Sequence, residues 1–234
     1  MTSHPFGLPD DYQDNPRQHY DASSRYWTEE RIRNAHYYQA SVYAYAEDLA
    51  RKQAAKVLVD VGCGVGTKLQ AIHRNLPGLD ITGYDQAEGI AYCREQYDFG
   101  QWLEIDLEHP DSAQAIPSDI VICADVIEHL ENPDPLLGFL RACLKPGGVL
   151  VLSTPDRIAA RGPVSRRSPN PAHIREWSRP ELRGYLESQG FRVIRQRRMM
   201  SVPWQAGRLF INECLRPLVR GRSFFANQVC ECVL

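Results

Sequence analysis

The sequence predicts an α/β fold in which a doubly wound, mostly parallel sheet is covered by helices on both faces. Short apolar runs of strand type alternate with helical stretches along most of the chain. These runs stay apolar instead of alternating with polar residues, which is typical of parallel strands buried on both faces. With 234 residues and 43% hydrophobic composition the chain can bury one sizeable core, so we expect one main domain.

The expected elements follow one another from Thr28 onward. Thr28 caps a helix with acidic residues in its first turn that continues to about Lys52. Strands are expected at 56–61, 80–84, 101–105, 119–124 and 148–154, with helices starting near Thr67, Ala87 and Pro133. A long loop over 155–177 leads to a helix over 178–190, and 191–199 is the next strand.

We divide the chain into three segments. Residues 1–27, rich in Pro, Asp, Asn and Gln, form a loose N-terminal arm, and 28–200 form the main domain with a helical extension before the sheet. Residues 201–234 form an apolar extension with interspersed arginines. This extension can complete the sheet, form a homodimer contact or lie on a membrane surface. Because Pro217 and Gly221 interrupt any long helix, we expect it to pack on the domain or in a homodimer contact rather than to lie on a membrane.

Composition limits the functional classes. A net charge of -2 argues against a protein held mainly to nucleic-acid phosphates. The N-terminus has no apolar core of signal-peptide length and no stretch is long enough to cross a membrane, so we expect a cytoplasmic protein. The seven scattered cysteines suit reduced core thiols, while Cys230 and Cys232 form a CxC pair that is only a weak indication of metal binding.

The most informative motif is VLVDVGCGVGTKL at 57–69. A strand ends just after Asp60, a helix follows, and the loop between them consists largely of glycine, which lets backbone approach a ligand. The loop residues are Gly62, Cys63, Gly64 and Gly66, of which Cys63 contributes backbone. Asp85 ends the next strand, where a carboxylate can accept hydrogen bonds from both ribose hydroxyls of an adenosyl group. The structural alternative is a tight turn whose glycines bind nothing.

The charge before this loop indicates the cofactor. Dinucleotide-binding loops have the spacing GxGxxG and hold a pyrophosphate, whereas this loop has GxGxG and follows Asp60, which repels phosphate and favours an ammonium group. S-adenosylmethionine carries an ammonium, a sulfonium and an adenosine, and no phosphate. The sequence therefore favours S-adenosylmethionine over the cofactor of an NAD(P)-dependent dehydrogenase.

Over roughly residues 30–200 the sequence resembles the class I S-adenosylmethionine-dependent methyltransferases. The motifs that carry this resemblance are, in order, VLVDVGCGVG, ITGYDQ, LEIDLEHP, DIVICADVIEHL and LKPGGVLVLSTP. The resemblance implies a Rossmann-like sheet of seven strands with the last one antiparallel. It also implies that Asp85, with its neighbour Gln86, meets the ribose and that Asp106, with its neighbour Leu107, meets the adenine. Past residue 200 the stretch SVPWQAGRLFINECL is a poor match to a final strand.

The stretch ADVIEHL at 124–130 places two carboxyls and an imidazole where the fourth expected strand ends. It resembles the corresponding segment of ubiquinone-pathway O-methyltransferases and small-RNA 2'-O-methyltransferases. By the second resemblance, His173 in NPAHIREWS is the later histidine of a divalent-metal site with Asp125, Glu128 and His129. Two alternatives stay open, namely a metal-free base at His129 oriented by an acid, and a purely structural turn.

The long loop supplies the substrate prediction. Six arginines fall between 157 and 179 with one acid, and guanidinium groups suit phosphate or carboxylate, although a solvated basic loop is the alternative. The residues expected to bind substrate are Arg166, Arg167, Arg175 and Trp177. Aromatic side chains expected either to cover the cofactor or to pack the first helix are Tyr20, Tyr26, Trp27, Tyr37 and Tyr38. Trp204 is a further candidate pocket residue.

Together these features predict an O-methyltransferase that acts on a small or glycan-linked anionic acceptor, with His129, His173 and Asp125 as the catalytic residues. A softer resemblance, carried by NPAHIREWS after STPDR, is to methyltransferases of polysaccharide and secondary-metabolite assembly. Nucleic acid is a disfavoured acceptor because no separate RNA-binding module is visible. The competing functions are an RNA 2'-O-methyltransferase-like enzyme and a non-catalytic scaffold that binds an adenosyl ligand.

Overall fold

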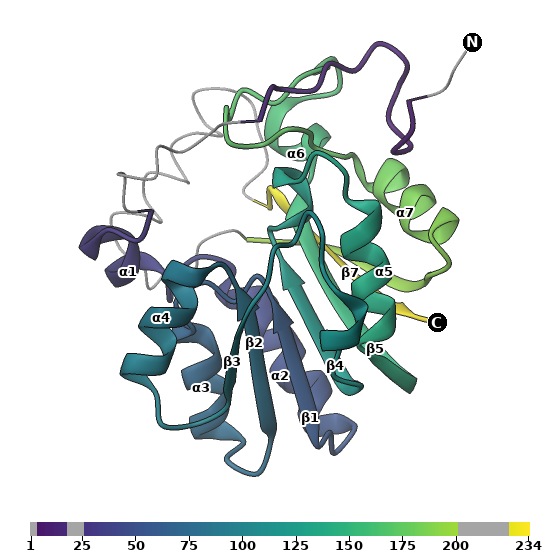
Figure 1. Ribbon diagram of the computed structural model, residues 1–234. Helices are drawn as coiled ribbons and strands as arrows, with labels where there is room; N and C mark the ends of the chain where they lie inside the picture. The colour runs from purple at the N-terminus through teal and green to yellow at the C-terminus, as the bar shows by residue number, and fades with distance from the viewer. Residues whose placement is uncertain (1–3, 18–25, 201–224) are drawn as a thin grey trace.

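The computed structural model describes residues 4–17, 26–200 and 225–234 (Figure 1). The helices are α1 (Glu29–Asn34), α2 (Ala40–Lys52), α3 (Thr67–Asn75), α4 (Ala87–Gln96), α5 (Asp134–Ala142), α6 (Arg157–Arg161) and α7 (Arg179–Ser188), with short 3-10 turns at Ser112–Gln114 and Ile127–His129. The strands are β1 (Val57–Val61), β2 (Asp80–Asp85), β3 (Gln101–Glu104), β4 (Ser118–Ala124), β5 (Leu144–Pro155), β6 (Arg192–Met199) and β7 (Asn227–Val233).

The strands form one sheet in the order β3-β2-β1-β4-β5-β7-β6. The first five strands are parallel, and β7 runs antiparallel to both β5 and β6. Chain order reverses between β1 and β4, so the carboxyl ends of these two strands flank the crevice in which such sheets bind ligands. The predicted doubly wound, mostly parallel sheet of seven strands is confirmed.

Successive residues along the central strands point to two separate hydrophobic cores. Leu58, Ile120 and Val151 pack with α2, α3 and α4 on one face. Val59 and Val121 pack with α5 and α7 on the other face. Both faces are therefore buried, which explains why the strands are apolar throughout.

Three expectations about local structure need correction. The first helix is not continuous, because Gln39 adopts a left-handed conformation with φ of 54° between α1 and α2. The expected loop after β5 contains a short helix, α6. The segment 4–17 is not loose, since it is hydrogen-bonded along the loop that follows α6. Figure 1 shows this segment beside that loop, above the carboxyl edge of the sheet.

The last residues of the chain complete the sheet. Residues 227–233 form β7, which is inserted between β5 and β6, so of the alternatives for the C-terminal extension this part follows the one in which it joins the sheet. Cys230 and Cys232 lie on one face of this strand with their side chains buried in the core, so the CxC pair is a packing feature. The stretch SVPWQAGRLFINECL and Trp204 lie outside the described residues.

Candidate functional site

The loop after β1 consists of backbone in conformations that favour glycine. Gly62, Gly64 and Gly66 have φ of 88°, 60° and 68°, in the left-handed region that other residues rarely adopt. A Cβ atom at Gly62 would lie 2.3 Å from Val126 Cγ2, and one at Gly64 would lie 2.9 Å from the Trp27 ring. The backbone conformation and the lack of space therefore both disfavour a side chain at these positions, so the loop after β1 presents mainly backbone atoms.

Asp60 places a buried carboxylate beneath this loop. Its Oδ2 accepts a hydrogen bond from the Tyr43 hydroxyl at 2.8 Å, and its Oδ1 is buried with no partner among the described residues. Burial raises the pKa of Asp60 to about 7, against the opposing effects of the Tyr43 bond and the charge of Lys68. An unpartnered carboxylate oxygen at this position fits the ammonium group of S-adenosylmethionine.

Asp85 is the second acid at the loop. Its carboxylate accepts the N–H of Gly64 at 2.7 Å and that of Gln86 at 2.8 Å, while burial raises its pKa. Asp85 is thus held against the glycine loop at the end of β2, as its predicted contact with the ribose requires. Gln86 is exposed at the start of α4.

The predicted adenine contacts lie just beyond β3, on the same edge of the sheet. Asp106 is exposed and accepts the N–H of Glu108 at 3.0 Å, which stabilises a local turn. Leu107 is partly buried against the core. Both residues are near enough in the sheet order to line an adenosine site next to Asp85, and their contact with adenine stays a prediction.

One of the five predicted aromatic residues lies directly on the glycine loop. The Trp27 ring is the nearest group to a Cβ added at Gly64, and the backbone N–H groups of Tyr26 and Trp27 donate to the Glu88 carboxylate at 3.1 and 3.3 Å. Tyr26 and Tyr38 are exposed, so packing of these two rings onto the sheet is not observed. Tyr20 lies outside the described residues.

Asp125 ends β4 in a strained conformation with φ of 55°. Its carboxylate accepts the Ser153 hydroxyl at 2.6 Å, the Gln39 amide at 3.0 Å and the Asn227 amide at 2.9 and 3.1 Å. Gln39 also has a positive φ, so two strained residues are bonded to each other. Asn227, from β7, was not predicted to contribute here, because nothing in the sequence relates it to β4.

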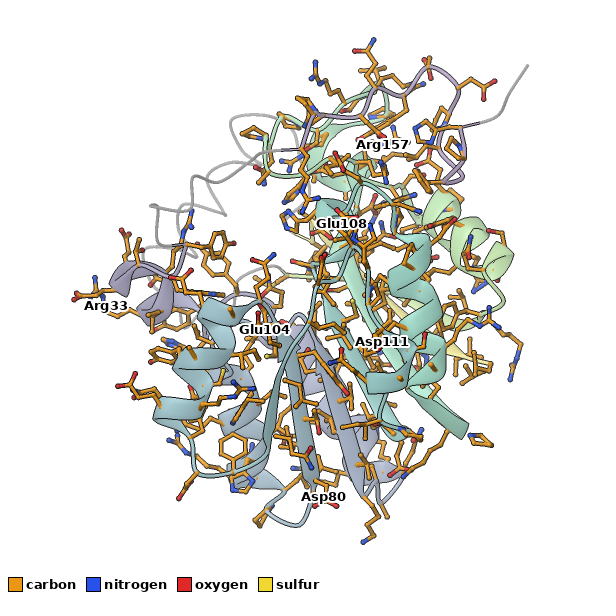
Figure 2. All side chains as sticks on the ribbon, in the orientation of Figure 1. Arg33, Asp80, Glu104, Glu108, Asp111 and Arg157 are labelled. Atoms are coloured by element: carbon orange, nitrogen blue, oxygen red, sulfur yellow. The ribbon has the colours of Figure 1, made fainter. Side chains whose placement is uncertain are left out.

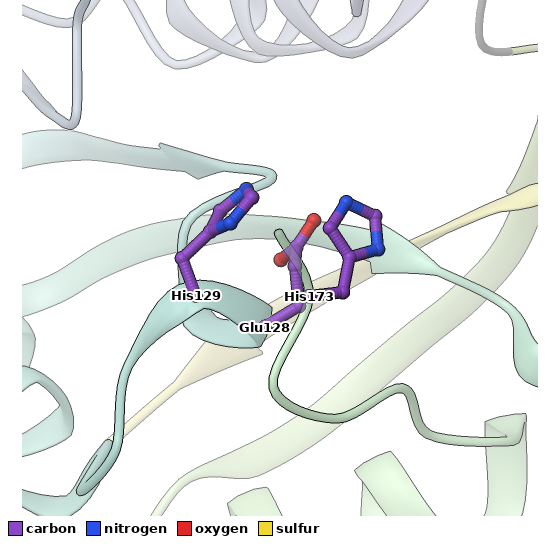
Figure 3. Close-up of side chains that lie close together, drawn as sticks. All are labelled: Glu128, His129 and His173. Atoms are coloured by element: carbon purple, nitrogen blue, oxygen red, sulfur yellow. The ribbon is translucent and has the colours of Figure 1, made fainter. Parts of the chain in front are cut away.

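Glu128, His129 and His173 form a compact cluster beyond the ends of β4 and β5. One potential ligand atom of each residue lies within 4.8 Å of those of the other two, and the two imidazole rings are 4.9 Å apart at 86°. In the view of Figure 3 the Glu128 carboxylate lies between the two rings. The prediction that these three residues converge therefore agrees with the structure. Asp125 is not part of this cluster, and its role as a fourth metal ligand stays a prediction.

The cluster combines an acid in an apolar environment with two oriented imidazoles. Glu128 Oε2 accepts the Thr154 hydroxyl at 2.9 Å, while Oε1 is buried without a partner among the described residues. Burial, and then the charge of Asp125, raise the pKa of Glu128 well above its ordinary value. Burial, and then His173, lower the pKa of His129.

Each imidazole uses its Nδ1 atom for a bond to the protein. His129 Nδ1 lies 2.7 Å from the Ala172 carbonyl oxygen, and His173 Nδ1 lies 2.7 Å from Glu176 Oε1. Because a carbonyl and a carboxylate can only accept, both Nδ1 atoms carry the proton. No hydrogen bond to either Nε2 is found among the described residues, so the lone pair of each Nε2 is available to accept a proton or to bind a metal ion.

Glu176 is a functional residue that the sequence analysis missed. It is fully buried and accepts hydrogen bonds from Arg161 at 2.8 and 3.0 Å, Ser168 at 2.8 Å and His173. Burial alone would raise its pKa, but the bonds from His173 and Arg161 outweigh burial and lower the pKa of Glu176 to about 2. The available signal was the spacing in HIRE, which places this acid three residues after His173.

The arginines predicted to bind an anionic substrate are bonded within the protein instead. Arg166 pairs with Asp11, Arg167 donates to Asn15, and Arg175 is buried in an ion pair with Asp14. The other three loop arginines also have partners, which are Glu181 for Arg157, Glu176 for Arg161 and the Gln196 carbonyl for Arg179. These partners offer a structural role for the arginines, and their contact with an anionic substrate stays a prediction.

Trp177 is likewise a core residue. Its ring is fully buried and stacked on Tyr185 with centroids 5.9 Å apart, and Nε1 donates to the Phe6 carbonyl at 2.8 Å. It cannot line a substrate pocket from this position.

Comparison with known proteins establishes the family. Residues 25–196 match the model of a methyltransferase domain. The chain belongs to this family. A probable S-adenosylmethionine-dependent methyltransferase of Mycolicibacterium smegmatis is 34% identical over 153 residues, which are 62% of this chain and 55% of that protein. The ubiquinone biosynthesis O-methyltransferase of Maricaulis maris is 33% identical over 105 residues, 43% of this chain and 41% of that protein. The chain thus spans about half the length of these relatives.

A solved structure supports the same fold. The S-adenosylmethionine-dependent methyltransferase of Mesorhizobium loti superimposes with a TM-score of 0.57 at 18% identity, covering 76% of this chain and 90% of the other. The chain is thus a class I methyltransferase-domain protein, as its motifs indicated. In the part of the chain that the structure describes, no helix is long and apolar enough to cross a membrane.

Proposed function

We propose that this protein transfers the methyl group of S-adenosylmethionine to a hydroxyl oxygen of a small or glycan-linked acceptor. The observation that carries the proposal is the pair of imidazoles, His129 and His173, whose Nε2 atoms are left free beside the carboxyl edge of the sheet. The cofactor fits the neighbouring glycine loop through the unpartnered Oδ1 of Asp60 and the carboxylate of Asp85.

A hydroxyl acceptor needs a group that removes its proton as the bond to carbon forms. In an in-line displacement the acceptor oxygen attacks the methyl carbon, the C–O bond forms, and the C–S bond breaks to give S-adenosylhomocysteine. The acceptor proton passes to an imidazole Nε2. Because burial lowers the pKa of His129, this ring is neutral at pH 7 and can accept the proton.

A divalent metal ion is the alternative to the imidazole base, because an Nε2 lone pair that binds a metal ion cannot also accept the acceptor proton. The buried, unpartnered Oε1 of Glu128 and the two free Nε2 atoms make a mixed O/N donor set that fits such an ion. Bound there, the ion would supply Lewis-acid polarisation of an acceptor oxygen. The protein's own contribution is to hold both rings in one tautomer through Ala172 and Glu176.

The anionic character of the acceptor is not part of this proposal, because the arginines that suggested it are paired with the protein's own acids. A cytoplasmic location and a homodimer stay predictions. An RNA 2'-O-methyltransferase-like enzyme and a non-catalytic scaffold are the competing functions, and they are outcomes of the test below.

The test is transfer of label from methyl-labelled S-adenosylmethionine into separate fractions of small hydroxylated metabolites, glycans and RNA. We expect label in the metabolite or glycan fraction, and loss of labelling with His173→Ala. Loss under a chelator, restored by added divalent ion, would support the metal. Label in RNA alone would contradict the proposed acceptor class. Binding of the cofactor without any labelling, in the wild type and in the variant alike, would favour the scaffold.

A further inference from the structure

We propose that residues 4–17 are a working part of the site and that Asn15 is a positioning residue for His173. This segment, called the N-terminal strap below, was expected to be a loose arm. In the structure it is bonded to the loop that carries His173, along most of that loop's length. The inference rests on the proposed function only in taking His173 as a group that acts on the acceptor.

Asn15 is the centre of these contacts. Its side chain is buried, and its amide nitrogen donates to the carbonyl oxygens of Ser168 at 3.0 Å, Asn170 at 3.2 Å and His173 at 2.8 Å. Its backbone N–H donates to the Ile174 carbonyl at 2.8 Å. An asparagine amide has two protons, which these three carbonyl oxygens share. The Asn15 side chain therefore holds the segment 168–173 at its beginning and at its end.

Strap residues that precede Asn15 repeat this pattern. The Gln13 N–H donates to the Arg166 carbonyl at 2.8 Å, and the Tyr12 hydroxyl accepts the Glu176 N–H at 2.8 Å. Phe6 accepts the indole N–H of Trp177. The strap therefore supplies partners for a loop that has little regular secondary structure after α6 and whose buried polar groups would otherwise be unpaired.

The strap also connects the loop to the turn that carries His129. Asp14 accepts two hydrogen bonds from the buried guanidinium of Arg175, with its Oδ2 2.7 Å from Arg175 Nη2. The same guanidinium donates to the carbonyls of Leu130 at 3.2 Å and Glu131 at 3.0 Å, directly after His129. One ion pair thus fixes the strap, the loop and the histidine turn relative to one another.

These contacts reach the backbone around His173, whereas the polar contact of its imidazole is with Glu176. The strap thus determines the position of the His173 imidazole, whereas the hydrogen bond that sets its tautomer comes from Glu176. Displacement of a reacting group by about 1 Å can reduce a rate by about 100-fold. Figure 2 shows this region beyond the carboxyl edge of the sheet, with Arg157 and Glu108 labelled there and Asp80 at the opposite end.

The test compares Asn15→Ala with a matched control in the full-length protein. The control is Asp11→Asn, which breaks an exposed ion pair between the same strap and the same loop without touching the His173 turn. We expect Asn15→Ala to lower kcat at least tenfold, with binding of S-adenosylhomocysteine unchanged within twofold by calorimetry. Asp11→Asn is expected to leave both values within twofold of the wild type.

A second readout does not depend on activity. In spectra of protein labelled with [15N]histidine, the Nδ1–H signal of His173, assigned from its absence in His173→Ala, reports the bond to Glu176. We expect this signal to broaden or shift in Asn15→Ala and to stay unchanged in Asp11→Asn. If Asn15→Ala does not fold, Asn15→Ser, which keeps one donor, is measured in the same way with the same direction expected.

The outcomes separate this inference from the proposed function. An unchanged kcat and an unchanged His173 signal in the Asn15 variant would overturn the inference. If His173→Ala keeps full activity while the Asn15 variant still loses the signal, the proposed use of His173 fails and the positioning by Asn15 stands. An equal loss of kcat in Asn15→Ala and in Asp11→Asn would indicate that the strap only stabilises the fold in general, and it would also overturn the inference.

Discussion

Replacement of Glu176 by glutamine should remove a pH-dependent contribution to stability that can be calculated from the structure. The folded-state pKa of Glu176 is about 2, below the ordinary glutamate value of 4.5, because bonds from His173 and Arg161 outweigh burial. A depressed carboxyl pKa stabilises the folded state above the unfolded pKa, and this contribution is lost as the pH falls through the folded pKa. The difference corresponds to about 3 kcal/mol in total, of which about 1.4 kcal/mol is lost by pH 3.5.

The assay is urea unfolding of the wild type and Glu176→Gln at pH 6.5 and at pH 3.5. At pH 6.5 we expect the variant to be less stable by about 3 kcal/mol, since the substitution also leaves Arg161 without its buried counter-ion. At pH 3.5 the gap between the two proteins should narrow by about 1.4 kcal/mol. A gap that is the same at both pH values would refute the assignment of Glu176 as an ionised carboxylate that holds His173.

Two further predictions concern the glycine loop and the second histidine. Gly64→Ala should weaken binding of S-adenosylhomocysteine at least tenfold by calorimetry, because a Cβ there lies 2.9 Å from the Trp27 ring and the φ of 60° is unfavourable for alanine. The control is Gly78→Ala, which has no atom within 4 Å of the added Cβ and should bind as the wild type does. If His129 is the base, kcat/KM should fall as the pH is lowered through the pKa of His129, because protonation removes the lone pair that accepts the proton. Burial lowers this pKa, so the fall should be centred below pH 6.5. The same fall in His129→Asn would assign the pKa to another group.

The sequence was sufficient to predict the parallel part of the sheet, because these strands carry a local signal, whereas the position of β7 was not predicted. Parallel strands buried on both faces must be apolar throughout, and the glycines at 62, 64 and 66 are needed where the backbone has a positive φ. The convergence of His129 and His173 was predicted through the resemblance of ADVIEHL and NPAHIREWS to small-RNA 2'-O-methyltransferases.

The features that were missed depend on pairings between distant parts of the chain. Asn15 bonds to His173, and Asn227 bonds to Asp125, yet neither residue stands in a pattern that distinguishes it from other polar loop residues. The protein partners of the loop arginines were missed for the same reason: a count of arginines over acids within one segment cannot include Asp11 and Asp14, which lie on the strap. The break at Gln39 has no glycine or proline to indicate it.

The central claim, that the cofactor binds on the glycine loop and the acceptor chemistry occurs at the neighbouring cluster, is tested most directly by calorimetric titration of S-adenosylhomocysteine into three proteins. The wild type should bind, Asp85→Ala should bind at least tenfold more weakly, and Glu128→Gln should bind within twofold of the wild type, because Glu128 belongs to the acceptor side. Binding that is unaffected by Asp85→Ala, or abolished by Glu128→Gln, would contradict this division of the site.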